Sequence, residues 1–208
     1  MTSSTLRLHG FPLSGHCHRV ELMLSLLGLK FERLDVDLFN GAHKRPEFLA
    51  KNPFGQIPVL EDGAVTLSDS NAILVYLATR YDSGRSWLPQ DAVAAAQVQR
   101  WLSVAAGELA HGPAAARLVA LFGVPLDVAR AKTIAAALYG VLEAHLGAQR
   151  FLVGSTPSIA DVALYSYTAH APEGGVSLES YPNVRAWLSR IETLPGFVAM
   201  PRSTPKAA

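Results

Sequence analysis

The apolar positions of the first 80 residues switch between the period of a strand and that of a helix. Residues 6–9 alternate apolar and polar side chains, which predicts a short strand, and residues 16–27 repeat apolar side chains at helical spacing. Residues 34–38 alternate again and predict a second strand, and residues 46–49 allow a short helix. A strand, a helix and a strand in this order imply a parallel pair with a right-handed crossover.

Residues 52–63 (NPFGQIPVLEDG) place a proline between two β-forming residues. Proline lacks the N–H that a strand ladder needs, so it belongs at the start of a strand, at an edge or at a bulge. We predict that Ile57 and Pro58 are joined by a cis peptide bond at the mouth of a strand. Residues 59–67 then predict a hairpin with an Asp-Gly turn, and an apolar helix follows over residues 71–80. The hairpin completes a mixed four-stranded sheet.

The strand signal almost disappears after residues 81–90 (YDSGRSWLPQ), a polar segment with Gly and Pro that predicts a domain linker. Beyond it, helical spacing of apolar residues recurs over four segments: 98–109, 128–146, 158–167 and 182–194. The predicted fold class is α/β plus all-α, with an α/β domain over residues 1–80 and an all-helical bundle over residues 91–208. Ser158 and Asp161 predict a helix N-cap close to a capping box, which matters for folding and not for chemistry.

Composition narrows the class of protein. The chain has 208 residues, half of them apolar and 17% charged, so it can bury a core and is not disordered. The net charge is +1 without a run of Lys or Arg, which argues against nucleic acid or an anionic membrane as the main partner. The single Cys17 excludes an internal disulfide framework and fits a reducing compartment. With no signal-peptide pattern and no membrane-length apolar run, we expect a soluble, cytoplasmic protein.

Four segments of the first domain are expected to converge at one end of its sheet. They are residues 11–17, residues 41–44, residues 56–58 and the pair at 69–70. Together they offer a hydroxyl at a helix N-terminus, two cations, exposed backbone groups and an acid–hydroxyl pair at a helix start. A helix N-terminus attracts anions. The set therefore suits a small ligand with carboxylates at both ends, an amine and a peptide-like middle.

These motifs resemble the cytosolic glutathione transferase family. The matching strings are SGHCHRV, GAHKRPEFLAKNPFGQIPVLEDG, LSDSNAILVYLA and PSIADVALYSY, and the resemblance covers about residues 5–200. The pattern is nearest the bacterial members and the theta- and delta-like classes, which use Ser instead of Tyr near the thiol. The resemblance implies a thioredoxin-like glutathione-binding domain over residues 1–80, and a helical domain that contributes the site for an electrophile.

The resemblance also implies roles for particular residues. Ser14 would donate a hydrogen bond to the glutathione sulfur. Ser70 and its helix N-terminus would take the γ-glutamyl carboxylate, and Asp69 would face the amine. The backbone of Ile57 would pair with the cysteinyl residue, and His43 with its neighbour would face the glycyl carboxylate. The implied glutathione-binding set is His43, Lys44, Gln56, Ile57, Pro58, Asp69 and Ser70.

Thiol chemistry agrees with the role implied for Ser14. A free thiol with a pKa of about 8.5 is only a few per cent ionised at neutral pH. Lowering that pKa by about two units stabilises the thiolate by roughly 2.7 kcal/mol. One charge-assisted hydrogen bond plus a helix N-terminus is of that size, so the protein need not supply a proton-abstracting base.

Simpler interpretations of the same residues stay open. Ser14 can serve only as a helix N-cap, and Asp69 with Ser70 can be a plain capping pair. His43 can be a solvated loop residue. Cys17 occupies the place of the second Cys of a redox pair, but it lies on the apolar face of its helix and is expected to be buried and inert. The histidines on either side of it diverge, so no metal site is expected.

The second substrate is expected between the two domains. Candidate contacts are Phe11, Leu13, Trp101, His111, Arg117 and Tyr165. The resulting hypothesis is a detoxifying glutathione transferase that populates the thiolate and offers it to a hydrophobic electrophile, with glutathione as co-substrate and no cofactor. Family members are usually homodimers, so a homodimer is expected. A glutathione-dependent disulfide reductase, peroxidase or isomerase of this fold, or a non-catalytic binding protein, are the alternatives.

Overall fold

A computed structural model describes residues 5–203, which form parts of two compact units. The first unit combines residues up to Ser83 with Pro195–Pro201, and the second combines Gly84–Leu194 with the residues from Arg202 onward. Residues 195–201, expected in the helical domain, thus group with the first unit. The expected domain limits at residues 1 and 208 lie outside the described residues.

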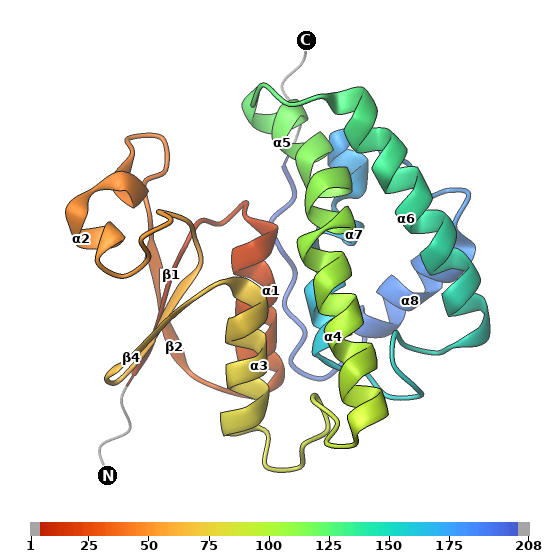
Figure 1. Cartoon of the computed structure of the whole chain (residues 1–208), viewed down its shortest axis with the longest axis horizontal. Coiled ribbons are helices and arrows are strands. Elements are labelled where there is room, and N and C mark those ends of the chain that lie inside the picture. The colour runs from red at the N-terminus through yellow and green to blue at the C-terminus, as the bar shows by residue number, and fades with distance from the viewer. Residues whose placement is uncertain (1–4, 204–208) are drawn as a thin grey trace. The chain divides into compact units, whose positions relative to one another are not determined.

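The first unit contains a four-stranded sheet in the order β2-β1-β3-β4. Strand β1 runs parallel to β2 and antiparallel to β3, and β4 is antiparallel to β3, as predicted for a mixed sheet. Helices α1 and α3 lie on one side of the sheet and α2 on the other (Figure 1). The bounds are β1 Leu6–Gly10, α1 Gly15–Leu26, β2 Phe31–Asp35, a 3-10 turn η1 Ala42–Lys44, α2 Pro46–Leu49, β3 Val59–Asp62, β4 Val65–Ser68 and α3 Ser70–Tyr81.

Strand β2 begins and ends earlier than the alternation over residues 34–38 predicted. It is an edge strand with little burial, so its own residues carry a weak alternating pattern. Val36 is buried just beyond it, in a cluster with Phe48 and Val59. The apolar residues at 36 and 38, which suggested a strand, therefore belong to the loop after β2, and this loop packs against Phe48 of α2.

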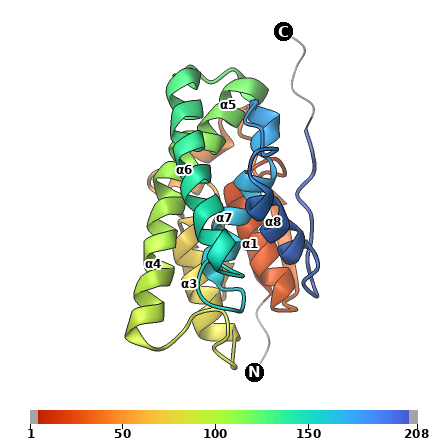
Figure 2. The same ribbon diagram turned by 90° about the vertical axis from the view of Figure 1, so that its right-hand side faces the viewer.

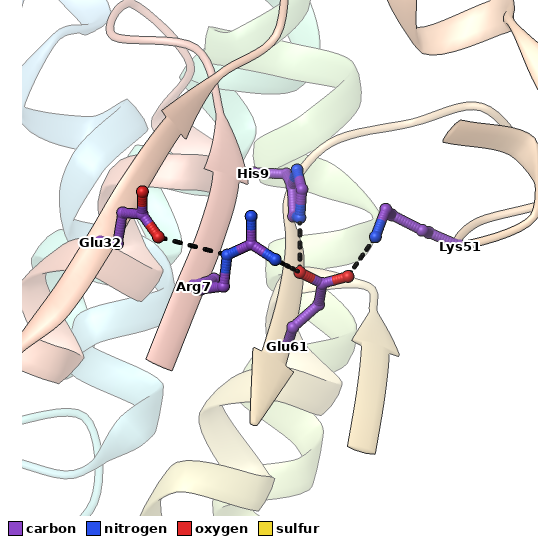
Figure 3. Close-up of polar contacts among 5 residues, drawn as sticks. All are labelled: Arg7, His9, Glu32, Lys51 and Glu61. Carbon is purple, nitrogen blue, oxygen red and sulfur yellow. Dashed lines mark hydrogen bonds and ion pairs between the residues drawn. The ribbon is translucent and has the colours of Figure 1, made fainter. Parts of the chain in front are cut away.

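The two faces of the sheet differ in chemistry. Leu8 and Leu60 lie opposite each other in register and are buried. The neighbouring side chains point to the α2 face, where the Glu61 carboxylate accepts hydrogen bonds from Arg7 at 3.2 Å, from His9 at 3.0 Å and from Lys51. Figure 3 shows this ion network, which Arg7 extends to a glutamate of β2 at 3.2 Å. The hydrogen bond from Lys51, followed by that from His9, lowers the pKa of Glu61 to about 2.

The C-terminal segment is tied to α1 within the first unit. Ser25 Oγ donates to the carbonyl of Gly196 at 2.6 Å, and His18 Nε2 lies 2.9 Å from the carbonyl of Val198. His18 is buried although it is polar. These bonds explain why residues 195–201 belong with the sheet domain.

The second unit is all-helical, as predicted. Its helices are α4 Ala92–Ala106, a π-helical turn η2 Ala110–Ala114, α5 Ala115–Phe122, α6 Val128–Ala148, α7 Ile159–Ala169, a 3-10 turn η3 Ala171–Gly174 and α8 Pro182–Glu192. Helix α7 is buried almost throughout and packs against α4 and α8 (Figure 2). The sequence predicted neither α5 nor the π-helical turn before it, where Pro113 removes a backbone donor. Within residues 5–203, no helix is both long and apolar enough to cross a membrane.

The predicted capping box at the start of α7 is present. The buried Asp161 carboxylate accepts from the backbone N–H groups of Ser158 at 2.8 Å and Leu152 at 2.9 Å, and from Trp187 Nε1 at 2.8 Å. One carboxylate thereby fixes the helix start, the preceding loop and α8, which is a folding role.

Candidate functional site

The register of the sheet brings four connecting segments to one end. Gly10 at the end of β1 lies opposite Asp35 at the end of β2, and His9 lies opposite Val59, which begins β3. Val59 in turn lies opposite Ser68, which ends β4. Four segments therefore meet at the same end of the sheet, as expected from the sequence. Three of them follow β1, β2 and β4, and the fourth precedes β3.

Ser14 is the N-cap of α1. Its backbone is extended, and its Oγ accepts a hydrogen bond from the Cys17 N–H at 3.3 Å. The first turn of α1 contains no acidic residue, so no carboxylate neutralises the positive end of the helix dipole there. A hydroxyl has one donor and two acceptor sites. The Ser14 side chain also forms a hydrogen bond with the Cys17 thiol, so a ligand at this point would compete with that thiol for the Ser14 proton.

Cys17 is fully buried on the inner side of α1. Burial raises the pKa of its thiol to about 12. A Cβ at Gly10 would lie 3.1 Å from the Cys17 sulfur, so the thiol fills a close contact between β1 and α1. The side chain is thus a packing group without thiolate character, in agreement with the inert role expected for it.

The loop before β3 holds the cis peptide bond predicted between Ile57 and Pro58. Within residues 5–203, no hydrogen bond engages the backbone of Ile57. The loop is fixed from behind by the buried Asn52 side chain, which donates to the carbonyl of Gln56 at 2.7 Å and accepts from Phe54 N at 3.1 Å. A rigid loop therefore presents an unengaged stretch of backbone next to the first residue of β3.

His43 and Lys44 lie against the same loop. Lys44 Nζ donates to the carbonyls of Phe54 at 3.3 Å and Gly55 at 3.1 Å. Gly55 has φ +59°, and a Cβ there would meet the His43 carbonyl oxygen at 2.8 Å, so only glycine fits this close approach. Among the described residues, His43 Nδ1 is buried without a hydrogen-bond partner.

Asp69 and Ser70 form the start of α3. Asp69 is the N-cap, and its Oδ1 accepts from Ala72 N at 2.9 Å. Its φ of +70° lies in the left-handed region that side chains rarely adopt, and such residues cluster at functional sites. Asp69 therefore caps α3, and its contact with a ligand stays a prediction. Ser70 is buried, and its hydroxyl contacts α1 side chains.

Two residues of α1 reach this point without having been predicted as site residues. Arg19 is only 1% exposed, and its Nη1 donates to Ser70 Oγ at 3.3 Å and to Asn71 Oδ1 at 2.8 Å. His16 Nδ1 lies 3.4 Å from Ser70 Oγ. Burial, followed by the charge of Arg19, lowers the pKa of His16 to about 3, so its ring is neutral at ordinary pH. Their i, i+3 spacing on one helix face was the signal in the sequence.

The candidates for the second substrate divide between the two units. Phe11 makes an edge-to-face contact with Phe39, with ring centroids 5.8 Å apart. Leu13, two residues further along the chain, is half-buried. In the second unit, His111 is exposed in the π-helical turn. Tyr165 is buried, and its hydroxyl donates to a glutamate of α8 at 3.0 Å.

Two further candidates are occupied by structural contacts. Trp101 Nε1 donates to the carbonyl of Leu152 at 3.0 Å, and the buried Arg117 pairs with Glu173 at 2.6 Å. Trp101 also borders a surface hollow of about 340 Å³, whose lining is both polar and apolar. The hollow is lined by Gln97, Arg100, Trp101, His145, Gln149, Leu152 and Gly154. Residues 5–203 contain no cluster of three or more His, Cys, Asp or Glu side chains that could hold a metal ion.

The sheet order and the cis-proline loop define the first unit as a thioredoxin-like domain, and an all-helical unit follows it in the chain. Comparison with known proteins gives the family. Residues 13–80 match the family model for the glutathione S-transferase N-terminal domain, and residues 126–195 match the model for its C-terminal domain. The chain belongs to the glutathione S-transferase family.

Individual relatives match over nearly their whole length. Glutathione S-transferase 3 of Zea mays is 39% identical over 204 residues, which covers 92% of this chain and 91% of the relative. The crystal structure of a glutathione S-transferase from Pseudomonas fluorescens has a TM-score of 0.88 at 37% identity and covers 95% of this chain and 99% of its own. A glutathione transferase homologue from Drosophila mojavensis, solved with bound glutathione, has a TM-score of 0.83 at 29% identity, with coverage of 92% and 89%. The theta- or delta-like subclass stays a prediction.

Proposed function

We propose that the protein is a glutathione transferase that binds glutathione at this end of the sheet and presents its thiolate to a hydrophobic electrophile. The observation that carries the proposal is the Ser14 hydroxyl at the N-terminus of α1, placed at the same sheet end as the unengaged Ile57 backbone and the start of α3. Membership of the family supports it. So does the relative that was solved with bound glutathione.

The proposed contacts follow the length of glutathione. The Ile57 backbone pairs with the cysteinyl residue, beside Pro58 and Gln56. Ser70 donates to the γ-glutamyl carboxylate, and Asp69 faces the amine with the carboxylate oxygen that does not cap α3. His43 and Lys44 face the glycyl carboxylate. Lys44 has three N–H donors, and the two carbonyls of the loop account for two of them.

The proposed chemistry needs no base. The Ser14 hydroxyl accepts from the Cys17 N–H and donates its own proton to the glutathione sulfur. The thiol proton leaves to solvent, and the thiolate is stabilised by this hydrogen bond and by the N-terminus of α1. The sulfur then forms a bond to the electrophilic carbon, and the leaving group departs with its electron pair. The rate gain comes from the thiolate population and from proximity.

Two assays test the proposal on the full chain. Calorimetric titration should show saturable binding of glutathione and of S-methylglutathione. The folded protein should also conjugate glutathione to 1-chloro-2,4-dinitrobenzene. Ser70→Ala should weaken both ligands about 10-fold, because a hydrogen bond to a charged group is lost. A folded protein that binds neither ligand would rule out the enzyme and favour a non-catalytic role. If the protein reduced a glutathione mixed disulfide but did not conjugate glutathione to the aryl halide, it would be a glutathione-dependent reductase.

We also propose a homodimer located in the cytoplasm. The resemblance to the family supports the dimer, and the single, buried Cys17 fits a reducing compartment. Sedimentation equilibrium of the full chain tests the dimer, since a monomer at micromolar concentration would contradict it. Fractionation of cells that express the protein tests the compartment.

A further inference from the structure

The hollow of about 340 Å³ in the second unit is lined by α4, the C-terminal end of α6 and the loop that follows it. Its volume lies at the low end of the range of about 300–1,000 Å³ for small-molecule sites, so it has room for a ligand with one ring. Every residue proposed to bind glutathione belongs to the first unit, and none of them lines the hollow.

The floor of the hollow is fixed by hydrogen bonds to the Leu152 backbone. The Leu152 carbonyl accepts from Trp101 Nε1 at 3.0 Å and from His145 Nε2 at 3.0 Å. The Leu152 N–H donates to the buried Asp161 carboxylate at 2.9 Å. The rings of Trp101 and His145 also meet edge to face, with centroids 5.0 Å apart. A ligand would therefore meet a surface that is already formed, and binding it would require little ordering of the protein.

The rim of the hollow consists of polar side chains without partners. Gln97, Arg100 and Gln149 are exposed, and within residues 5–203 no hydrogen bond or ion pair engages their side chains. The Arg100 guanidinium lies over the ring of Trp101, 4.5 Å from its centroid. This contact holds the cation at the rim without using any of its five N–H donors in a hydrogen bond. No Asp or Glu lines the hollow, so its charge is positive.

His145 adds an acceptor to this positive hollow. A carbonyl oxygen can only accept, so the Nε2 atom that is bonded to Leu152 carries a proton. In the neutral ring the other nitrogen, Nδ1, then has a lone pair, and no hydrogen bond within the described part of the chain engages it. Both lone pairs of the Leu152 carbonyl are already occupied. A ligand donor would therefore bind Nδ1 and not this carbonyl.

We propose that the hollow is a binding site for a small aromatic carboxylate that also carries a hydroxyl or N–H donor. The carboxylate pairs with the Arg100 guanidinium, whose planar fork matches it. The donor binds His145 Nδ1, and the ring lies against the apolar atoms of Trp101 and Leu152 that line the hollow. The inference does not depend on the proposed binding of glutathione, because the two sites share no residue.

Calorimetric titration of the full chain with 4-hydroxybenzoate tests the site. The parent protein should bind one equivalent per chain, and binding should be saturable. Benzoate lacks the hydroxyl and should bind about 3- to 10-fold more weakly, as expected for one neutral hydrogen bond. The uncharged 4-hydroxybenzyl alcohol should bind about 10-fold or more weakly, because the charge-assisted pair with Arg100 is lost.

Three variants show whether the ligand occupies the hollow. Arg100→Gln should weaken 4-hydroxybenzoate about 10-fold and change 4-hydroxybenzyl alcohol by less than about 2-fold. His145→Gln keeps an N–H donor for the Leu152 carbonyl but lacks the ring acceptor. It should reduce the difference between 4-hydroxybenzoate and benzoate to less than about 2-fold. Gln97→Phe replaces an exposed lining side chain with a bulky ring that occupies part of the hollow, and it should abolish saturable binding.

Arg130→Gln is the matched control, because it removes the same charge from the same unit. Arg130 is exposed near the start of α6, about 22 Å along the helix axis from His145. Its replacement should leave the dissociation constant of 4-hydroxybenzoate at the parent value. The dissociation constant of glutathione should be equal in the parent, Arg100→Gln and Arg130→Gln.

Four results would overturn the inference. They are a parent protein without saturable binding of 4-hydroxybenzoate at millimolar concentration, equal weakening by Arg100→Gln and Arg130→Gln, unchanged binding in Gln97→Phe, and a loss of glutathione binding in Arg100→Gln that matches the loss of 4-hydroxybenzoate. If His145→Gln does not fold, Arg100→Gln and Gln97→Phe decide, since both positions are exposed. A parent protein that binds 4-hydroxybenzoate as expected but no glutathione would overturn the proposed function alone.

Discussion

Replacement of Ser14 tests the origin of the thiolate most directly. In the structure this hydroxyl caps α1 through the Cys17 N–H at 3.3 Å, and in the proposed mechanism it also donates to the glutathione sulfur. Ser14→Ala removes both interactions. The change should therefore lower the stability of the fold and raise the pKa of the bound thiol, and the two effects can be measured separately.

The magnitudes follow from the two hydrogen bonds. Loss of a serine N-cap to alanine costs about 1 kcal/mol of unfolding free energy. Loss of one hydrogen bond to a charged group costs about 1.5–3 kcal/mol, which corresponds to a rise of roughly one to two units in the thiol pKa. If the parent holds the bound thiol near a pKa of about 6.5, kcat/KM at that pH should fall about 5- to 50-fold, whereas the loss above about pH 9 should be less than 2-fold, because both proteins are then ionised.

The assay is the ultraviolet absorbance of the bound thiolate against pH, together with pH profiles of kcat/KM. Ser14→Gly is the matched variant, because glycine at an N-cap costs only a few tenths of a kcal/mol relative to serine. It should keep most of the stability and show the same thiol pKa as Ser14→Ala. An unchanged thiol pKa in both variants, or an equal loss of kcat/KM at all pH values, would remove Ser14 from the mechanism.

Three further predictions concern the frame around the site. Glu61→Gln should cost about 1–2 kcal/mol at neutral pH in chemical denaturation, a value discounted because its partners are partly exposed. The pKa of Glu61 in the folded protein is about 2, below its ordinary 4.5. The stabilisation by its carboxylate is therefore fully present above pH 4.5 and should be lost as the pH falls through 2. If the parent and Glu61→Gln still differed in their free energy of unfolding below pH 2, this reasoning would be wrong. Gly55→Ala should lower the free energy of unfolding by roughly 1–3 kcal/mol and weaken glutathione binding, since the new Cβ clashes with the His43 carbonyl. An unchanged unfolding free energy and an unchanged dissociation constant for glutathione, both measured by calorimetry, would refute the clash. Asp161→Ala should cost about 3 kcal/mol or more in thermal unfolding, because it leaves buried donors unpaired, including Trp187 Nε1, and a shift near zero would count against that role.

The sequence predicted the element order of the first unit, the mixed sheet, the cis bond before Pro58 and the meeting of four segments at one sheet end. These features rest on local signals in the sequence: the periodicity of apolar residues, the turn residues and a proline at the start of a predicted strand. Arg19 was missed, because a charged residue on the buried face of a helix conflicts with the rule that such faces are apolar. Its partners Ser70 and Asn71 lie about fifty positions further along the chain, so the sequence pattern of α1 does not reveal them.

Other differences have the same cause. The π-helical turn around Pro113 and the early end of β2 depend on packing between segments distant in sequence. The second-substrate candidates rested on residue type alone, and Trp101 and Arg117 proved to be occupied by contacts within the second unit. Ser14 shows a different limit. The N-cap and the thiol contact were treated as competing interpretations, whereas the geometry of a hydroxyl permits both.

The attachment of residues 195–201 to α1 makes the sheet domain discontinuous along the chain. During synthesis the ribosome releases the four strands and three helices of this domain first, and the segment that binds Ser25 and His18 emerges only after the helical unit. The nascent sheet domain must therefore wait, with one side of α1 uncovered, until the helical unit has been translated. The first unit is thus incomplete until residues 195–201 have been translated, and a nascent chain stalled after residue 83 should be digested by protease faster than one that includes those residues.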